Sequence, residues 1–299
     1  MKHRAVYGGM IVFLCMLWGL GNPIIKVAGH SIAPFASIAL RFSLAFLVFM
    51  VFFGRRVLRN LRTVKWPQTI AVCIFTALAF TLGSFALMLT EAMIAGFLIS
   101  IAVLFTPFLE PIILRTRFNW RILPIVLIVC VGMYLLCGGG AFSFGLGELL
   151  AVLCSISYAI MLTLSEKYIG NIDTVTLSTL QCATAAILSI ACMLIFEGVF
   201  DPRTLTWEGV GAIAYLSLAS TCAAYVLQNK ALRHIPATFA SLIFCTEPVF
   251  TVFFSYLLLG ETLDLMGVIG AAIILAGVMY ASVMRPQGNA DIAFSQNPD

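Results

Sequence analysis

A carboxylate and a guanidinium stand inside long apolar stretches of this sequence. Glu247 lies midway along the stretch 236–259, directly before Pro248, and Arg41 lies about eight residues into the stretch 33–53. A charge at the centre of a bilayer costs on the order of 3 kcal/mol, so such side chains face a bundle interior and mark pathways for ions or solutes. Because Pro248 has no backbone N–H, it predicts a polar break in its helix.

Each of these two charges has a functional and a structural interpretation. Glu247 can bind a substrate or carry a proton, or it can bridge helices without contacting either. Arg41 keeps its charge and therefore needs an anion or carbonyl groups. It can clamp a substrate carboxylate, or it can form a structural pair with Glu247. The sequence leaves both alternatives open.

Weaker candidates surround these charges. Trp18 and Asn22 lie beside glycines in the first apolar stretch, where an aromatic ring and an amide suit a cavity wall. Close helix packing through the small residues explains the same pattern. Tyr158, Gln181 and Ser100 are further candidates for a substrate or coupling site. The candidate helix breaks or hinges are Pro23, Pro107, Pro111 and Pro248.

Ten apolar stretches, each about long enough to cross a bilayer, must position these residues. They run near 6–26, 33–53, 67–88, 93–114, 122–138, 145–165, 175–196, 207–228, 236–259 and 265–284. A helix rises about 1.5 Å per residue, so about 20 apolar residues span about 30 Å of hydrocarbon. Hydrophobic residues make up 62% of the chain and charged residues 10%, against roughly a quarter charged in soluble domains. The sequence predicts an all-α integral membrane protein with ten transmembrane helices, located as a multi-pass protein in the cell membrane.

The distribution of basic residues predicts the orientation. If the N-terminus is cytoplasmic, 14 of the 17 Lys and Arg fall in inner segments, five of them in the connection Arg55–Lys65. The outer segments then keep only Arg203. This split follows the positive-inside rule and predicts that both ends are cytoplasmic. It also explains the net charge of +4 without nucleic-acid binding.

The two halves of the chain resemble each other. Trp18 matches Tyr158 and Arg41 matches Gln181 at a shift of 140 positions, and Gly132 matches Gly277 at a shift of 145. Each half holds five helices, an odd number, so the second copy enters the bilayer from the opposite side. The predicted architecture is two inverted five-helix repeats, typical of secondary transporters. The boundaries are 1–143 for the first repeat, 144–285 for the second and 286–299 for a disordered cytoplasmic tail.

Several short runs resemble the EamA family of the drug/metabolite transporter superfamily. The first half shows Ala86–Ala92, then Ala95-Gly96-Phe97, Ser100 and Pro107; the second shows Ala231-Leu232, Ala240–Leu242, Glu247-Pro248 and Gly260-Glu261. The sequence departs from the family pattern at two places. Tyr158 stands at the second Trp-like position, and the first half has Ala102-Val103 where the second has Glu247-Pro248. The resemblance covers about 280 residues. It implies an exporter of small metabolites such as amino acids or amines, or of drugs, with protons as a candidate coupling ion.

Other function classes find less support. No GxxxxGK[ST] loop is present, which excludes an ATP-driven pump built from this chain alone. The nine cysteines lie in apolar stretches, and the histidines (His3, His30 and His234) lie at helix ends, so we expect no metal site and no cofactor. All five aspartates fall in connections or the tail, which leaves an intramembrane enzyme without an aspartate pair. A non-transporting membrane receptor is the other alternative, but it does not need an inverted repeat.

Overall fold

The computed structural model describes residues 2–28, 32–90, 92–137, 145–260 and 264–283, and every regular element in these ranges is helical. The first half contains α1 (Lys2–Ala28), α2 (Pro34–Asn60), α3 (Trp66–Leu89), α4 (Ala92–Ser100), α5 (Ala102–Leu114), η1 (Trp120–Ile122) and α6 (Leu123–Leu136). The second half contains α7 (Leu146–Tyr168), η2 (Ile169–Asn171), α8 (Thr174–Phe196), η3 (Pro202–Thr204), α9 (Trp207–Ser217), the π-helical η4 (Leu218–Ala223), α10 (Ala224–Leu232), α11 (Ala237–Phe244), α12 (Glu247–Leu259) and α13 (Leu265–Val283).

Membrane-length apolar helices make up almost all of this bundle. Nine helices in the described ranges are long and apolar enough to cross a bilayer, and Trp120–Leu136 is a shorter apolar helix. The all-helical membrane fold is therefore confirmed. The expected boundaries agree closely, except that α2 continues to Asn60, seven residues beyond its predicted end. The connection 138–144 and the tail 286–299 lie outside the described residues.

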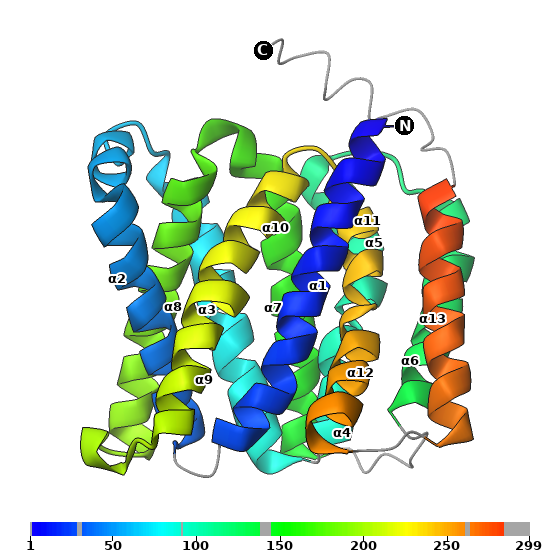
Figure 1. Cartoon of the computed structure of the whole chain (residues 1–299). Helices are drawn as coiled ribbons and strands as arrows, with labels where there is room; N and C mark the ends of the chain where they lie inside the picture. The colour runs from blue at the N-terminus through cyan, green and yellow to red at the C-terminus, as the bar shows by residue number, and fades with distance from the viewer. Residues whose placement is uncertain (1, 29–31, 91, 138–144, 261–263, 284–299) are drawn as a thin grey trace.

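Helices far apart in the sequence form the main packing pairs (Figure 1). α2 packs along α8, α6 along α13 and α3 along α7, while α1 packs against α12 on one side and α9–α10 on the other. Glycines allow one of these approaches, because a Cβ on Gly270 would lie 2.5 Å from the backbone oxygen of Gly132 and from the backbone nitrogen of Leu136. Close packing through small residues is the usual source of helix association in lipid.

The connections that carry most of the basic residues lie at one end of the bundle. α1 begins and α13 ends at the top of Figure 1, where the α2–α3, α5–η1, α7–α8 and α10–α11 connections also lie. We call this the basic end and the opposite one the far end. The α8–α9 connection, with Arg203, lies at the far end.

Carboxylates fix α2 and α8 to each other at both ends of the bundle. At the basic end, Asp173 caps α8 through the backbone N–H of Thr176 and pairs with Arg56 of α2 at 2.5 Å. At the far end, the Glu197 carboxylate accepts hydrogen bonds from the backbone N–H groups of Phe35 and Ala36, at 2.7 and 2.8 Å. Both contacts satisfy free donors at a helix N-terminus.

Two membrane spans are interrupted at mid-depth. The fourth span breaks at Ile101 between α4 and α5, and the ninth breaks at Cys245 and Thr246 between α11 and α12. Glu247 and Pro248 then form the first turn of α12, where a missing N–H costs nothing. Pro248, a candidate helix break, thus stands directly after the interruption of the ninth span.

The other three candidate prolines stand within helices. Pro23 lies inside α1, and Pro107 and Pro111 lie inside α5, each within a continuous helix. A proline removes one hydrogen bond, and the remaining turns can keep the helix continuous when neighbouring helices hold it in place.

Candidate functional site

A cavity of about 500 Å³ lies between the two halves of the chain. Its wall includes residues of α1, α2, α3, α4, α5, α7, α9, η4, α11 and α12, and the segment at Ile32. Six of the seven substrate or coupling candidates line it: Trp18, Asn22, Arg41, Ser100, Tyr158 and Glu247. The two interrupted spans bring Ser100 and Glu247 there, since each stands directly beside a break.

The cavity extends from mid-depth to the far end. Ile32, Pro34 and Leu87 line its far portion, and these residues lie where α2 begins and α3 ends. Ser241 of α11 lines it nearer the basic end, and Phe244 and Tyr158 line it at mid-depth with their ring centroids 6.1 Å apart. No residue from the basic-end connections of the described chain lines it.

Arg41 is buried against the π-helical turn η4. Its Nε donates to Thr221 Oγ1 at 2.6 Å, and its Nη2 donates to the carbonyl and hydroxyl oxygens of Ser220, at 2.8 and 3.1 Å. Trp18 Nε1 donates to the same Ser220 carbonyl at 2.8 Å. A π-helical turn changes the regular hydrogen-bond ladder, and such turns recur at functional sites. The guanidinium also lies 5.7 Å from the ring centroids of Phe42 and Phe80.

Glu247 and Arg41 do not form the structural ion pair that the sequence left open. Between these two described side chains the structure shows no salt bridge, and the polar contact of the Glu247 carboxylate is Asn22 Nδ2 at 3.5 Å. The same Asn22 nitrogen donates to Thr251 Oγ1 at 2.8 Å. The cavity wall therefore carries a carboxylate and a guanidinium with separate partners.

Gln181 does not line the cavity. Its Nε2 donates to Thr76 Oγ1 at 2.9 Å, and its Oε1 accepts from Asn229 Nδ2 at 2.7 Å. Asn229 also donates to Ser178 Oγ at 3.0 Å. These buried residues lie between the cavity and the basic end, where they help to close the bundle.

The closed region also uses polar residues that the sequence analysis did not single out. The Tyr158 hydroxyl donates to Gln228 Oε1 at 3.2 Å, so Gln228 bonds across helices. Glu110 bridges α5 to the backbone of α11. Glu166 makes a similar contact, and its position near the end of an apolar stretch was the signal that could have identified it.

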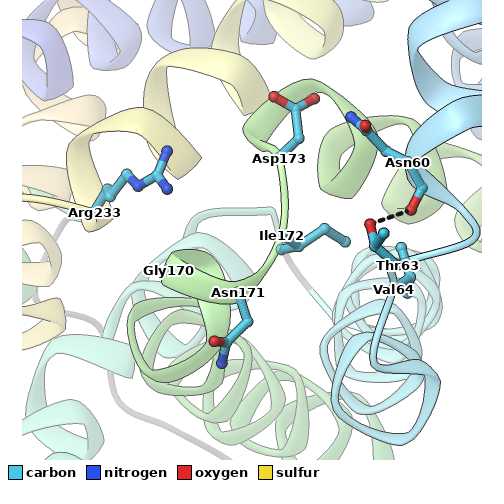
Figure 2. A pocket seen from close by; sticks show the side chains of 8 residues that line it. All are labelled: Asn60, Thr63, Val64, Gly170, Asn171, Ile172, Asp173 and Arg233. Atoms are coloured by element: carbon cyan, nitrogen blue, oxygen red, sulfur yellow. Dashed lines mark hydrogen bonds between the residues drawn. The ribbon is translucent and has the colours of Figure 1, made fainter. Parts of the chain in front are cut away.

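A second, smaller pocket of about 310 Å³ lies at the basic end (Figure 2). The α2–α3 connection, the turn before α8 and Arg233 surround it. Burial raises the pKa of Asp173 there, but hydrogen bonds from Arg56 and Thr176 outweigh that effect and hold the pKa below its usual range. The stabilising contribution of Asp173 is therefore present above its ordinary pKa and is lost as acid protonates it. Within the described residues, no cluster of His, Cys, Asp and Glu could hold a metal ion.

Comparison with known proteins identifies the family. A model of the EamA-like transporter family matches residues 7–138 and again residues 145–283. Two proteins of Archaeoglobus fulgidus, each named "Uncharacterized transporter", are 26% and 25% identical to this chain. The alignments cover 91% and 93% of the chain and 84% and 98% of the relatives.

A third relative and a solved structure extend the comparison. The uncharacterized transporter YoaV of Bacillus subtilis is 23% identical over 90% of this chain and 94% of its own length. One crystal structure superposes with a TM-score of 0.80 at 19% identity, over 93% of this chain and 96% of that one, which supports the fold alone. These relatives point to a transporter and away from an enzyme. The chain is a multi-pass protein of the cell membrane and belongs to the EamA-like transporter family.

Proposed function

We propose that this chain is a secondary transporter that moves a small organic solute through the central cavity by alternating access. One observation carries the proposal: a cavity of about 500 Å³ at mid-depth reaches the far end and is closed toward the basic end. Sites for drug-sized ligands typically measure about 300–1,000 Å³ and combine apolar walls with few polar groups. A solute in this cavity is exposed to one side of the membrane only.

An inverted repeat supplies the second conformation that such a transporter needs. Arg41 donates to Thr221, and its repeat mate Gln181 donates to Thr76, which is the repeat mate of Thr221 at the 145-position shift. The two helix breaks correspond as well, since Ile101 and Thr246 are separated by the same 145 positions. These correspondences, and the two matches to the family model, support repeats at 1–143 and 144–285.

The packing of the helices supports the same symmetry. An exchange of the two halves maps the α2–α8 and α6–α13 contacts onto themselves. It maps α3–α7 onto the contact of α9–α10 with α1, and α1–α12 onto the contact of α7 with α5. Two copies related in this way can trade conformations, which closes the far end and opens the basic end. In that second state Gln181 would approach the solute pathway.

The cavity chemistry favours a zwitterion or an amine as the solute. Arg41 offers a guanidinium to a carboxylate, and Glu247 offers a carboxylate to an ammonium group. Glu247 contacts Asn22 and Arg41 contacts Ser220, so the two charges do not neutralise each other. Both can therefore bind charged groups of a solute. Amino acids and amines fit this description. Export, with protons as the coupling ion, rests on the family resemblance.

A transport assay tests the proposed function. We expect purified protein in proteoliposomes to accumulate at least one radiolabelled amino acid or amine, and an imposed proton gradient to change the initial rate. Empty liposomes are the control. If no compound of a broad metabolite panel moves, with or without the gradient, the transporter proposal fails.

The orientation is proposed from the charge distribution. With the basic end in the cytoplasm, a cysteine at Val199, which is 85% exposed beside the far end of α8, should react with a membrane-impermeant maleimide added to intact cells. A cysteine at Arg59, at the basic end, should react only after the membrane is permeabilised. A cysteine-free background serves as the blank. The reverse pattern would overturn the orientation.

A further inference from the structure

Two carboxylates from different helices hold the N-terminus of α11. Glu166 Oε2 of α7 accepts the backbone N–H of Ala237 at 2.7 Å, and Glu110 Oε2 of α5 accepts that of Thr238 at 2.7 Å. The cap residue Pro236 makes no side-chain capping bond of its own. The free N–H groups and the positive end of the helix dipole stabilise an anion at this point. α5, α7 and α11 are therefore joined at the basic end.

These contacts lie at the end of α11 away from the cavity. Ser241 and Phe244 of α11 line the cavity, whereas the two carboxylates hold its first two residues. Ser241 lies four residues after Ala237, so the cavity floor and these contacts are separated by roughly 6 Å along the helix axis. The short helix α11 thus connects the cavity floor to the closed end.

The same arrangement appears on α5. Val103 lines the cavity, Thr106 follows one turn later and is completely buried, and Glu110 follows after another turn on the same helix face. Thr106 therefore marks the closed segment between the cavity and Glu110. Movement of α11 away from α5 would expose this position.

The other half of the chain lacks the two carboxylates. At the repeat shifts of 140 and 145 positions, Glu166 corresponds to Lys26 and Glu110 corresponds to Ser255. If each repeat needed this contact in order to fold, both halves of the chain would carry it. The carboxylates therefore distinguish one end of the bundle from the other.

We propose that Glu110 and Glu166 form a latch that keeps the basic end closed and favours the state in which the cavity faces the far end. The inference rests on the proposed alternating access. Release of Ala237 and Thr238 is then the step that opens the basic end. Loss of the latch should move the population toward the opposite state.

Two reporter cysteines test the latch in the full chain without its nine native cysteines. Thr106→Cys reports opening at the basic end, and Ser37→Cys, on the cavity wall in α2, reports opening at the far end. Impermeant maleimide is added to sealed vesicles of each orientation. In Glu110→Ala/Glu166→Ala we expect Thr106→Cys to react about tenfold faster or more from the basic side, as the loss of charge-assisted hydrogen bonds implies. Ser37→Cys should react more slowly from the far side.

A matched control uses another carboxylate that caps a helix. Glu197 also accepts two successive backbone N–H groups in the first turn of a helix, here α2, but as a single carboxylate and at the far end. Glu197→Ala should leave the Thr106→Cys rate unchanged. If the double alanine variant does not purify as a single species, Glu110→Gln, which keeps an acceptor, should show the same changes to a smaller extent.

The reciprocal change separates the latch from general loosening. If both reporters react faster together, or if Thr106→Cys is unchanged in a folded variant, the latch is refuted. Labelling is measured without a solute, so its outcome is independent of the transport assay. If a solute is transported but the two labelling rates do not change in the variant, the latch alone is refuted. If the two labelling rates change in opposite directions but no solute is transported, only the transporter proposal is refuted.

Discussion

Glu247→Gln is expected to lower the transport rate about 10- to 100-fold while the protein still folds, as expected for the loss of one hydrogen bond to a charged group. The carboxylate lines the cavity, and its polar contact is the amide of Asn22 at 3.5 Å. Glutamine keeps an oxygen that can accept from Asn22 but cannot bind an ammonium group or carry a proton. Since Glu247 makes no salt bridge to Arg41, the substitution leaves no cation without its partner.

Initial transport rates in proteoliposomes and melting temperatures test this prediction together. Glu148→Gln is a matched control, because Glu148 accepts from Thr90 and from the backbone of Gly145 and does not line the cavity. The Glu148→Gln protein should transport at the rate of the unsubstituted protein when both are assayed well below their melting temperatures. A well-folded Glu247→Gln protein with unchanged transport would exclude an essential ammonium contact and an essential proton carrier at this position.

Arg41→Gln is expected to reduce transport of a carboxylate-bearing solute by about 10- to 100-fold while changing the free energy of unfolding by less than about 1 kcal/mol. Arg41 is 8% exposed and binds hydroxyl and carbonyl oxygens without a carboxylate partner. Burial of such a charge is costly, and that cost offsets the gain from its hydrogen bonds. Trp18 still donates to the Ser220 carbonyl after the change.

The position that matches Arg41 in the proposed repeat already holds a glutamine, Gln181, which donates to Thr76. We therefore expect Arg41→Gln to keep the bond to Thr221 and to lose the bonds to Ser220. A panel that pairs each amino acid with its decarboxylated amine measures the effect, because only the carboxylate-bearing members should lose transport. Equal losses for both members, or a large drop in melting temperature, would assign Arg41 a structural role instead.

The sequence predicted the membrane fold because a bilayer imposes a length and a composition that can be read directly. It also predicted the break at Pro248, where a missing N–H has a local effect. It could not predict the break at Ile101, because no proline follows that residue directly and Pro107 lies inside a continuous helix. Ile101 and Thr246 are separated by 145 positions and correspond under the proposed repeat, so we infer that tertiary packing accounts for the first break.

The candidate site could be predicted only in part, for a related reason. Charged, polar and aromatic residues of the apolar stretches identified six residues of the cavity wall, but the partner of Arg41 could not be deduced. The segment Leu218–Ala223 carries no proline and no glycine that would mark its π-helical form, and Arg41 and Trp18 donate to its Ser220 carbonyl from other helices. Gln181 was expected at the cavity because it matches Arg41. Under the proposed inverted repeat, the matching contact of Gln181 with Thr76 lies toward the opposite side, where the bundle is closed.

The shortest apolar helix among the described membrane-crossing segments has a consequence for the surrounding lipid. The 17 residues of Trp120–Leu136 extend about 25 Å, less than the roughly 30 Å of a hydrocarbon core. Trp120 is 73% exposed at the start of this span, where an indole ring favours the headgroup region. Lipids beside α6 and its partner α13 therefore have to shorten to match the helix, and thicker bilayers increase that deformation. Membrane thickness becomes a physical variable that acts on two helices outside the cavity wall, of which α6 packs against α4, α5 and α12 of that wall.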